Sequence, residues 1–202
     1  MQAMLKAVRR ALLVVAAALT LTTPALAQFG SPGYRFLEAV RARDYNAANQ
    51  MLADSSTVIN TREVQSGDTA LLIVIERRDL PWLNMLLSRG ADANIANRDG
   101  ESPLRRVVQL GWAEAVPYLS THGARINDSG SSGETALHIA VQRRDIAMVR
   151  ALVAAGANPD LSDNITGKTP RDLAMEDRRT PAILAALDER PTAPPHPVAG
   201  PN

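Results

Sequence analysis

The 202-residue chain contains no cysteine, and this absence removes several classes of chemistry at once. It excludes disulfide frameworks, thiolate metal sites and cysteine nucleophiles. The three histidines, His122, His138 and His196, are too scattered along the chain to suggest a metal site. No Gly-x-Ser-x-Gly, Gly-x-x-x-x-Gly-Lys-Ser/Thr or His-Glu-x-x-His pattern occurs. We therefore expect no catalytic residue, no metal, no cofactor and no enzymatic activity.

Aromatic residues are scarce as well, at 3% of the chain, although hydrophobic residues make up 46%. The apolar content is therefore alanine and aliphatic residues, which suits a core of packed helices. The formal net charge is +1, but Lys6, Arg9 and Arg10 lie in the first 27 residues, which contain no acid. The remainder has 19 basic and 21 acidic residues, a net charge of −2. Because nucleic-acid binding normally requires a basic face, we expect no nucleic-acid partner.

The amino-terminal segment contains an apolar stretch at residues 11–21, preceded by three basic residues and followed by Ala25-Leu-Ala27. A span of bilayer requires about 20 apolar residues, so this stretch is too short for a transmembrane helix. The pattern predicts a secretory signal peptide cleaved before Gln28. An uncleaved membrane anchor is the alternative. We expect export to the periplasm of a Gram-negative bacterium, or secretion from the cell, and no membrane contact after cleavage.

Two series of glycines recur along the chain at intervals of 33 or 34 residues. The first series opens a Gly-x-Thr/Ser-Ala/Pro motif and consists of Gly67, Gly100, Gly133 and Gly167. The second series precedes alanine and consists of Gly90, Gly123 and Gly156. Two interleaved series with one period predict a repeat architecture.

Each motif has a local structural role. The Thr or Ser of the first motif can cap a helix, and Pro103 and Pro170 fall in the first helical turn, where a missing N–H is tolerated. Apolar residues then follow at helical spacing, as at Leu71, Val74 and Ile75. The second glycine can close a second helix in a left-handed conformation. Each period therefore predicts two helices.

This pattern resembles the ankyrin repeat, a turn followed by two antiparallel helices with a Thr-Pro-Leu-His-x-Ala signature. The best match is Thr-Ala-Leu-His-Ile-Ala at 135–140. The resemblance implies an all-α solenoid of helix–turn–helix units with a capping unit at each end. The expected organisation is a signal peptide at 1–27, a short linker at 28–33, an amino-terminal capping unit at 34–66, full repeats at 67–99, 100–132 and 133–166, a carboxy-terminal capping unit at 167–190 and an unstructured proline-rich tail at 191–202.

The resemblance also implies roles for individual residues. Thr135, Leu137 and His138 belong to the structural motif, with Leu137 in the core and His138 hydrogen-bonded to neighbouring turns. Ligands of this family usually contact the turn tips and the exposed side of the first helices, which line a concave face. The corresponding positions here are Arg98, Asp99, Glu101, Gln109, Leu110, Trp112, Ser131, Ser132, Glu134, Gln142, Arg143, Thr166 and Lys168.

We expect a monomeric, non-enzymatic module that binds another protein. The partner would be an exported protein that the module regulates or protects. One alternative is a secreted effector or inhibitor that binds a protein outside the cell. The other is a small-ligand binder that uses the concave groove.

Several residues depart from the family pattern. Arg43, Arg78 and Arg144 occupy equivalent positions, where the family usually has glycine, and each precedes an aspartate. Either the aspartate caps the second helix and the arginine is solvated, or the arginines form a rim for an acidic partner. Arg106 is equivalent to Ile73 and Ile139, a position expected on the core side of the first helix.

An arginine at that position must extend to solvent or pair with an acidic side chain.

Trp112 has two interpretations. It either forms an exposed binding hot spot with Leu110, because tryptophan is enriched in such sites, or packs under the neighbouring unit.

Export predicts a processed chain. Cleavage after Ala27 should leave Gln28 as the first residue of the mature protein, because Ala25 and Ala27 supply the small residues that signal peptidases require. Amino-terminal sequencing of the exported protein checks this. A chain that retains Met1 and sediments with membranes would favour the anchor instead.

Overall fold

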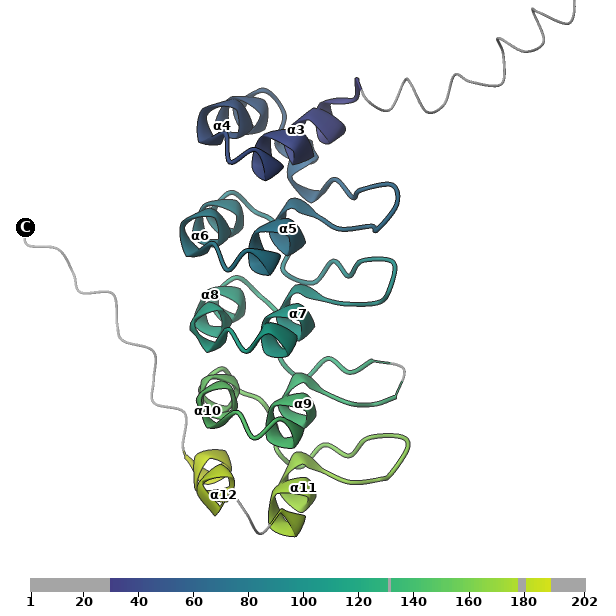
Figure 1. Cartoon of the computed structure of the whole chain (residues 1–202), viewed down its shortest axis with the longest axis vertical. Coiled ribbons are helices and arrows are strands. Elements are labelled where there is room, and N and C mark those ends of the chain that lie inside the picture. Colours follow the sequence, from purple (N-terminus) through teal and green to yellow (C-terminus); the bar gives the residue numbers. More distant parts are fainter. Residues whose placement is uncertain (1–29, 131, 178–180, 190–202) are drawn as a thin grey trace, which may run out of the picture. The chain divides into compact units, whose positions relative to one another are not determined.

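The computed structural model describes residues 30–130, 132–177 and 181–189 (Figure 1). The chain divides into two compact units. The first unit is Met1–Thr61 and the second is Arg62–Asn202. The expected signal peptide at 1–27, the cleavage residue Gln28, the proline-rich tail at 191–202 and Ser131 lie outside the described residues. The statements made about them above stay predictions.

The first unit contains helices α3 (Pro32–Arg41) and α4 (Tyr45–Asp54) and the 3₁₀ helix η1 (Ser56–Asn60). Its core includes the fully buried Phe36 and Val40 of α3. Helix α3 begins two residues before the expected boundary at 34, because the Ser31 hydroxyl accepts a hydrogen bond from the Tyr34 N–H and Pro32 fills the first turn.

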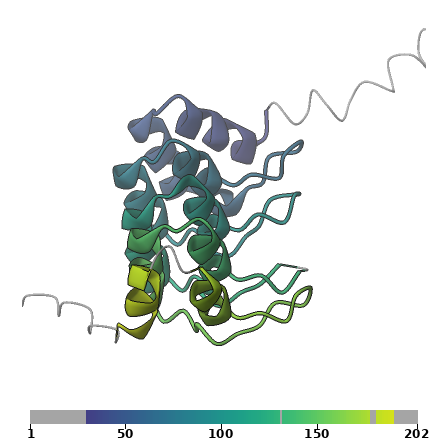
Figure 2. The ribbon, with the colours of Figure 1, turned by 60° about the horizontal axis from the view of Figure 1, so that its bottom comes forward.

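The second unit consists of helix pairs. Its elements are α5 (Ala70–Glu76), α6 (Leu80–Ser88), α7 (Pro103–Leu110), the 3₁₀ helix η2 (Ala113–Ala115), α8 (Val116–Thr121), α9 (Ala136–Gln142), α10 (Ile146–Ala154), α11 (Pro170–Glu176) and α12 (Pro181–Asp188). The first helices α5, α7, α9 and α11 contact one another in succession, and so do the second helices α6, α8, α10 and α12. Loops project on the side of the first helices (Figure 2). The described residues thus confirm the all-α helical repeat fold.

The first helices begin where the sequence predicts. The hydroxyl of Thr69 accepts a hydrogen bond from the Leu72 N–H at 3.4 Å, and that of Ser102 from the Arg105 N–H at 3.3 Å. Such caps satisfy amides that have no partner within the helix. Gly133 adopts a φ of +76°, and a Cβ there would lie 2.6 Å from the Asn164 nitrogen. This position therefore requires glycine both for its backbone conformation and for the close approach of the next loop.

The core of the second unit is mainly aliphatic, with Trp82 and Trp112 as buried aromatic residues, which agrees with the low aromatic content. Its large, fully buried side chains include Leu71, Ile75, Leu83, Leu86, Leu119, Leu137, Met148, Leu152 and Ile183. Within the described ranges, no helix is both long and apolar enough to span a membrane.

Leu137 is 1% exposed, so its truncation tests the core directly. We expect Leu137→Ala to lower the free energy of unfolding by about 2–5 kcal/mol, through lost apolar burial and the cavity left behind. Denaturant titration followed by circular dichroism measures the change. Ile165→Ala is the control, because Ile165 is 78% exposed and its truncation should change stability by less than about 0.5 kcal/mol. Equal losses in the two variants would contradict the assigned core.

Candidate partner-binding face

The loops that precede the first helices and the exposed sides of these helices lie together on one side of the second unit (Figures 1 and 2). We call this surface the inner face. The structure places eleven of the predicted binding residues in these loops and helices. Arg98, Asp99, Gln142, Arg143 and Thr166 are exposed, whereas Glu101, Gln109, Leu110, Ser132, Glu134 and Lys168 are half-buried.

Trp112 does not belong to this accessible set. Its side chain is 6% exposed, and it lies in the turn after α7, close in sequence to the fully buried Ala115 and Val116. Its backbone N–H donates to the Val107 carbonyl at 3.0 Å, which holds the turn against α7. Trp112 is therefore not an exposed hot spot. Its indole is buried in the protein, which removes much apolar surface from water.

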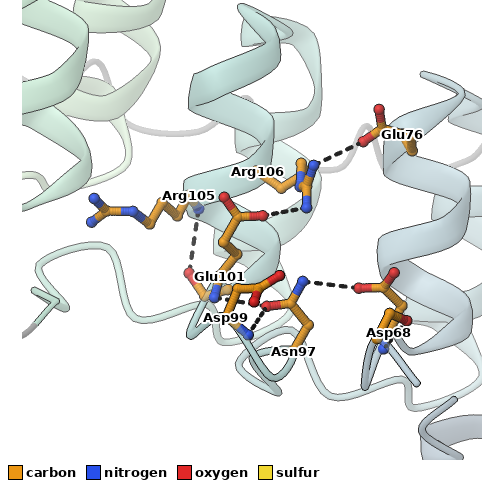
Figure 3. Close-up of polar contacts among 9 residues, drawn as sticks. Asp68, Glu76, Asn97, Asp99, Glu101, Arg105 and Arg106 are labelled. Atoms are coloured by element: carbon orange, nitrogen blue, oxygen red, sulfur yellow. Dashed lines mark hydrogen bonds and ion pairs between the residues drawn. The ribbon is translucent and has the colours of Figure 1, made fainter. Parts of the chain in front are cut away.

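Arg106 lies at the centre of a network of ion pairs on the inner face (Figure 3). Its Nη1 atom lies 3.2 Å from Glu76 Oε2, and its Nη2 atom donates to Glu101. The position is not on the core side, since the equivalent Ile73 and Ile139 are only half-buried. Arg106 therefore pairs with acids rather than only extending to solvent, and it joins the repeats 67–99 and 100–132.

Asn97 forms a second link, between the loops that precede α5 and α7, which the sequence-based predictions did not include. The side chain is 6% exposed, and its Nδ2 atom donates to Asp68 Oδ1 at 3.0 Å. Its Oδ1 atom accepts hydrogen bonds from the backbone N–H groups of Asp99 and Glu101, both at 3.0 Å (Figure 3). Asparagine in a turn often bonds the backbone two residues ahead, a signal that the sequence did carry. The contact with Asp68 carries no such local signal.

Glu134 links the repeats 100–132 and 133–166. Its Oε2 atom lies 3.2 Å from Arg105 Nη2 on α7, and its Oε1 atom accepts a hydrogen bond from Gln142 Nε2 at 3.1 Å. The inner face is therefore crossed by polar contacts between successive repeats. Several of its charges are paired within the chain.

His138 has the structural role that the family resemblance implies. It is fully buried, and its Nδ1 atom accepts a hydrogen bond from the Thr135 backbone N–H at 3.1 Å. Because Nδ1 is an acceptor there, Nε2 carries the proton and donates to the Lys168 carbonyl, 3.1 Å away in the next repeat. Thr135 and His138 thus complete a capping box at the start of α9.

At the turns between the helices, the structure confirms the predicted aspartate caps but not the solvated arginines. Asp79 and Asp145 cap α6 and α10 by accepting from the Trp82 and Met148 N–H groups. The arginines before them are not simply solvated, since Arg78 Nη2 donates to the Leu110 carbonyl and Arg144 Nε to Asp177. Both guanidinium groups therefore bond to the following repeat.

The parts of the chain that the structure describes contain no group of three or more histidine, aspartate or glutamate side chains arranged to hold a metal ion.

The loop before α11 holds a carboxylate with an altered pKa. Asp163 accepts hydrogen bonds from the Thr166 hydroxyl and backbone N–H and from the Ile165 backbone N–H. These bonds, above all that from the Thr166 hydroxyl, lower the pKa of Asp163 to about 2. Because this pKa lies below its ordinary value of 3.8, the bonds stabilise the loop fully above pH 3.8, and the effect disappears as the pH falls through about 2.

Thr166→Ala removes the largest cause of this shift. We expect the pKa of Asp163 to rise towards its ordinary value, as measured by titrating the carboxyl carbon in NMR spectra. Thr121→Ala is the matched control, because the Thr121 hydroxyl donates to the Pro117 carbonyl instead. An unchanged pKa in Thr166→Ala would show that this hydroxyl does not determine the ionisation of Asp163.

Comparisons with known proteins agree with this architecture. A family model described as ankyrin repeats in three copies matches residues 71–163 and 114–191. The B-cell lymphoma 3 protein homolog of Mus musculus is 33% identical over 158 residues, which cover 76% of this chain and 35% of that protein. The ankyrin repeat and SOCS box protein 6 of Homo sapiens is 30% identical over 147 residues, covering 72% of this chain and 35% of that protein.

Some relatives have enzyme names. The intracellular phospholipase A2 of Caenorhabditis elegans is 29% identical over 147 residues, which cover 67% of this chain but only 14% of that protein. The chain thus spans about a third or less of the lengths of these relatives. Ankyrin repeats generally bind other proteins and are not themselves catalytic. The glycine periods, the capped helix pairs and the family match together show that this chain belongs to the ankyrin-repeat family.

Proposed function

We propose that the chain is a non-enzymatic protein-binding module whose partner docks on the inner face of the second unit. The observation that carries this proposal is that side chains from different repeats are exposed on one surface. Arg98 and Asp99 lie at one loop tip, Gln142 and Arg143 at the end of α9, and Thr166 in the last loop. A partner that spans these positions contacts the loop before α7, the end of α9 and the loop before α11 at once.

The contacts between loops support this role because they order the surface before a partner arrives. The Arg98 N–H donates to the Ser66 carbonyl at 2.9 Å, and the Asn164 N–H to the Ser132 carbonyl at 2.8 Å. Asn97 adds a side-chain bond between the loops before α7 and α5, and Arg106 adds one between the helices α7 and α5 themselves. A preordered surface loses less conformational entropy on binding, which favours affinity.

The chemistry of the surface favours a folded protein over a highly charged polymer. Arg105, Arg106 and Lys168 each pair with a glutamate of the same surface, so they do not form an unbalanced basic stripe. The half-buried Leu110 and Ile139 supply apolar area beside these pairs. Mixed polar and apolar surfaces of this kind are typical of interfaces between proteins.

The proposed setting is the periplasm of a Gram-negative bacterium, where the monomeric module regulates or protects another exported protein. The basic and apolar pattern of residues 1–27 supports export. Cell fractionation distinguishes this setting from secretion. Recovery in the osmotic-shock fraction supports the periplasm, whereas recovery in the culture medium supports the alternative of a secreted effector or inhibitor.

The binding face is tested with glutamate substitutions on both sides of the unit. The partner is first captured from periplasmic extract, identified by mass spectrometry and purified, and its affinity is then measured by calorimetry. We expect Arg98→Glu and Leu110→Glu to weaken binding at least tenfold, about 1.4 kcal/mol, because binding energy concentrates in a few contacts.

Arg89→Glu is the matched control for Arg98→Glu. Arg89 is exposed at the end of the second helix α6, and the charge change is the same. Asn84→Glu on α6 serves the same purpose for Leu110→Glu. All variants must first show wild-type circular dichroism and melting. Equal losses from both faces, or a loss only from the second helices, would refute the inner face as the binding surface.

A further inference from the structure

The turn between the two helices of a repeat adopts a left-handed backbone conformation. The φ angle is 52° at Arg78, 65° at Gly111 and 57° at Arg144. Glycine adopts this conformation readily, whereas a side chain with a Cβ makes it unfavourable. An arginine in this conformation therefore requires compensation from the surrounding structure.

The two arginines obtain this compensation from the repeat that follows. Arg78 Nη2 donates to the Leu110 carbonyl, 32 positions along the chain, and Arg144 Nε donates to Asp177 Oδ2, 33 positions along. Hydrogen bonds from a charged donor are stronger than neutral ones. Each arginine thus fastens its inter-helix turn to the next repeat, and we call this contact an arginine staple.

The repeat 100–132 has no such staple, because Gly111 has no side chain. The adjacent position also differs, since Trp112 stands where Asp79 and Asp145 cap the second helices of the neighbouring repeats. Helix α8 accordingly has no side-chain cap, starts after a 3₁₀ turn, and has six residues where α6 and α10 have nine. The missing arginine, the missing aspartate cap and the altered start of α8 therefore occur together in one turn.

The other edges of this junction keep their links. On the loop side, Arg105 pairs with Glu134 of the next repeat at 3.2 Å. At the ends of the second helices, Asn127 Nδ2 donates to the Gly156 carbonyl at 3.1 Å, as Asn94 Nδ2 does to the Gly123 carbonyl at 3.0 Å one repeat earlier. The missing contact is thus confined to the inter-helix edge.

We propose that the junction between the repeats 100–132 and 133–166 is a one-sided hinge of the second unit. Its inter-helix edge, at Gly111 and α8, opens before the corresponding edges at Arg78 and Arg144, while the loop edge stays closed. Such opening tilts the two repeats against each other. It also changes the separation between inner-face residues of α7 and α9, such as Leu110 and Gln142, so that the surface can adjust to what it binds.

The hinge is tested by hydrogen exchange on the exported chain, residues 28–202, resolved by NMR for individual amides. In the wild type, we expect the amides of α8 to exchange at least tenfold faster than those at the same turn of α6 and α10, because local opening exposes them. Exchange of α8 as slow as that of its neighbours would overturn the proposal.

Gly111→Arg should install the missing staple. A Cβ at Gly111 would have room, with Asp145 Oδ2 of the next repeat 3.5 Å away as its nearest contact. An arginine there can reach that carboxylate or the Arg143 carbonyl, which is equivalent to that of Leu110. We expect exchange in α8 to slow towards the rate of α6. Glu114→Arg, which adds the same side chain at an exposed position in this turn, should leave the rate unchanged.

Gly111→Arg places an arginine in a left-handed conformation, which the fold must accommodate. Arg78→Gly provides a test without this requirement. Glycine relieves the unfavourable backbone conformation but removes the staple, so the two effects have opposite signs. If the staple holds the junction, amide exchange in α6 and in the turn at 78–79 becomes faster. If exchange there slows or stays the same, the staple has no stabilising role, and the proposed hinge is refuted even if Gly111→Arg does not fold.

Discussion

The loops that precede α5 and α9 lie against the loops that precede α7 and α11, and these contacts hold the repeats in their stack. Gly67 and Gly133 permit them, because a Cβ at either residue would come within 3 Å of a backbone nitrogen in the next loop. The approach allows the Ser66 carbonyl to accept from Arg98 and the Ser132 carbonyl to accept from Asn164. Without these glycines the loops would have to separate, and the inner face would lose its order.

The side chains of the inner face build on this stacking. Arg106 reaches Glu76, and Asn97 reaches Asp68, only because the two loops are held in register. These bonds pair several of the surface's charges within the chain. The remaining exposed groups, such as Arg98 and Gln142, extend from backbone that these bonds hold in place. For the proposed binding at this face, recognition would depend on the arrangement of a few such side chains.

The repeat 100–132 departs from its neighbours in a consistent way. Where they place an arginine in a left-handed turn followed by a capping aspartate, it has Gly111 and the buried Trp112. The indole stabilises the turn by apolar burial, whereas the neighbours use a side-chain cap and a hydrogen bond to the next repeat. The fold is retained, but the interactions that hold this one turn are different in kind.

The sequence by itself determined the repeat period, the starts of the first helices in the second unit and the left-handed conformation of Gly90, Gly123 and Gly156. A cap such as Thr69 bonds an amide three residues away, and the φ preference of glycine is a property of a single residue, so both signals are local. It also identified residues of the inner face, because position within a repeat indicates which residues lie in the loops and first helices. Only the tertiary structure decided the burial of Trp112, the ion pairs of Arg106 and the staple of Arg78. These depend on which side chains of different repeats meet, about one period apart in the chain, and on the direction in which each side chain turns. A local pattern carries no information about either.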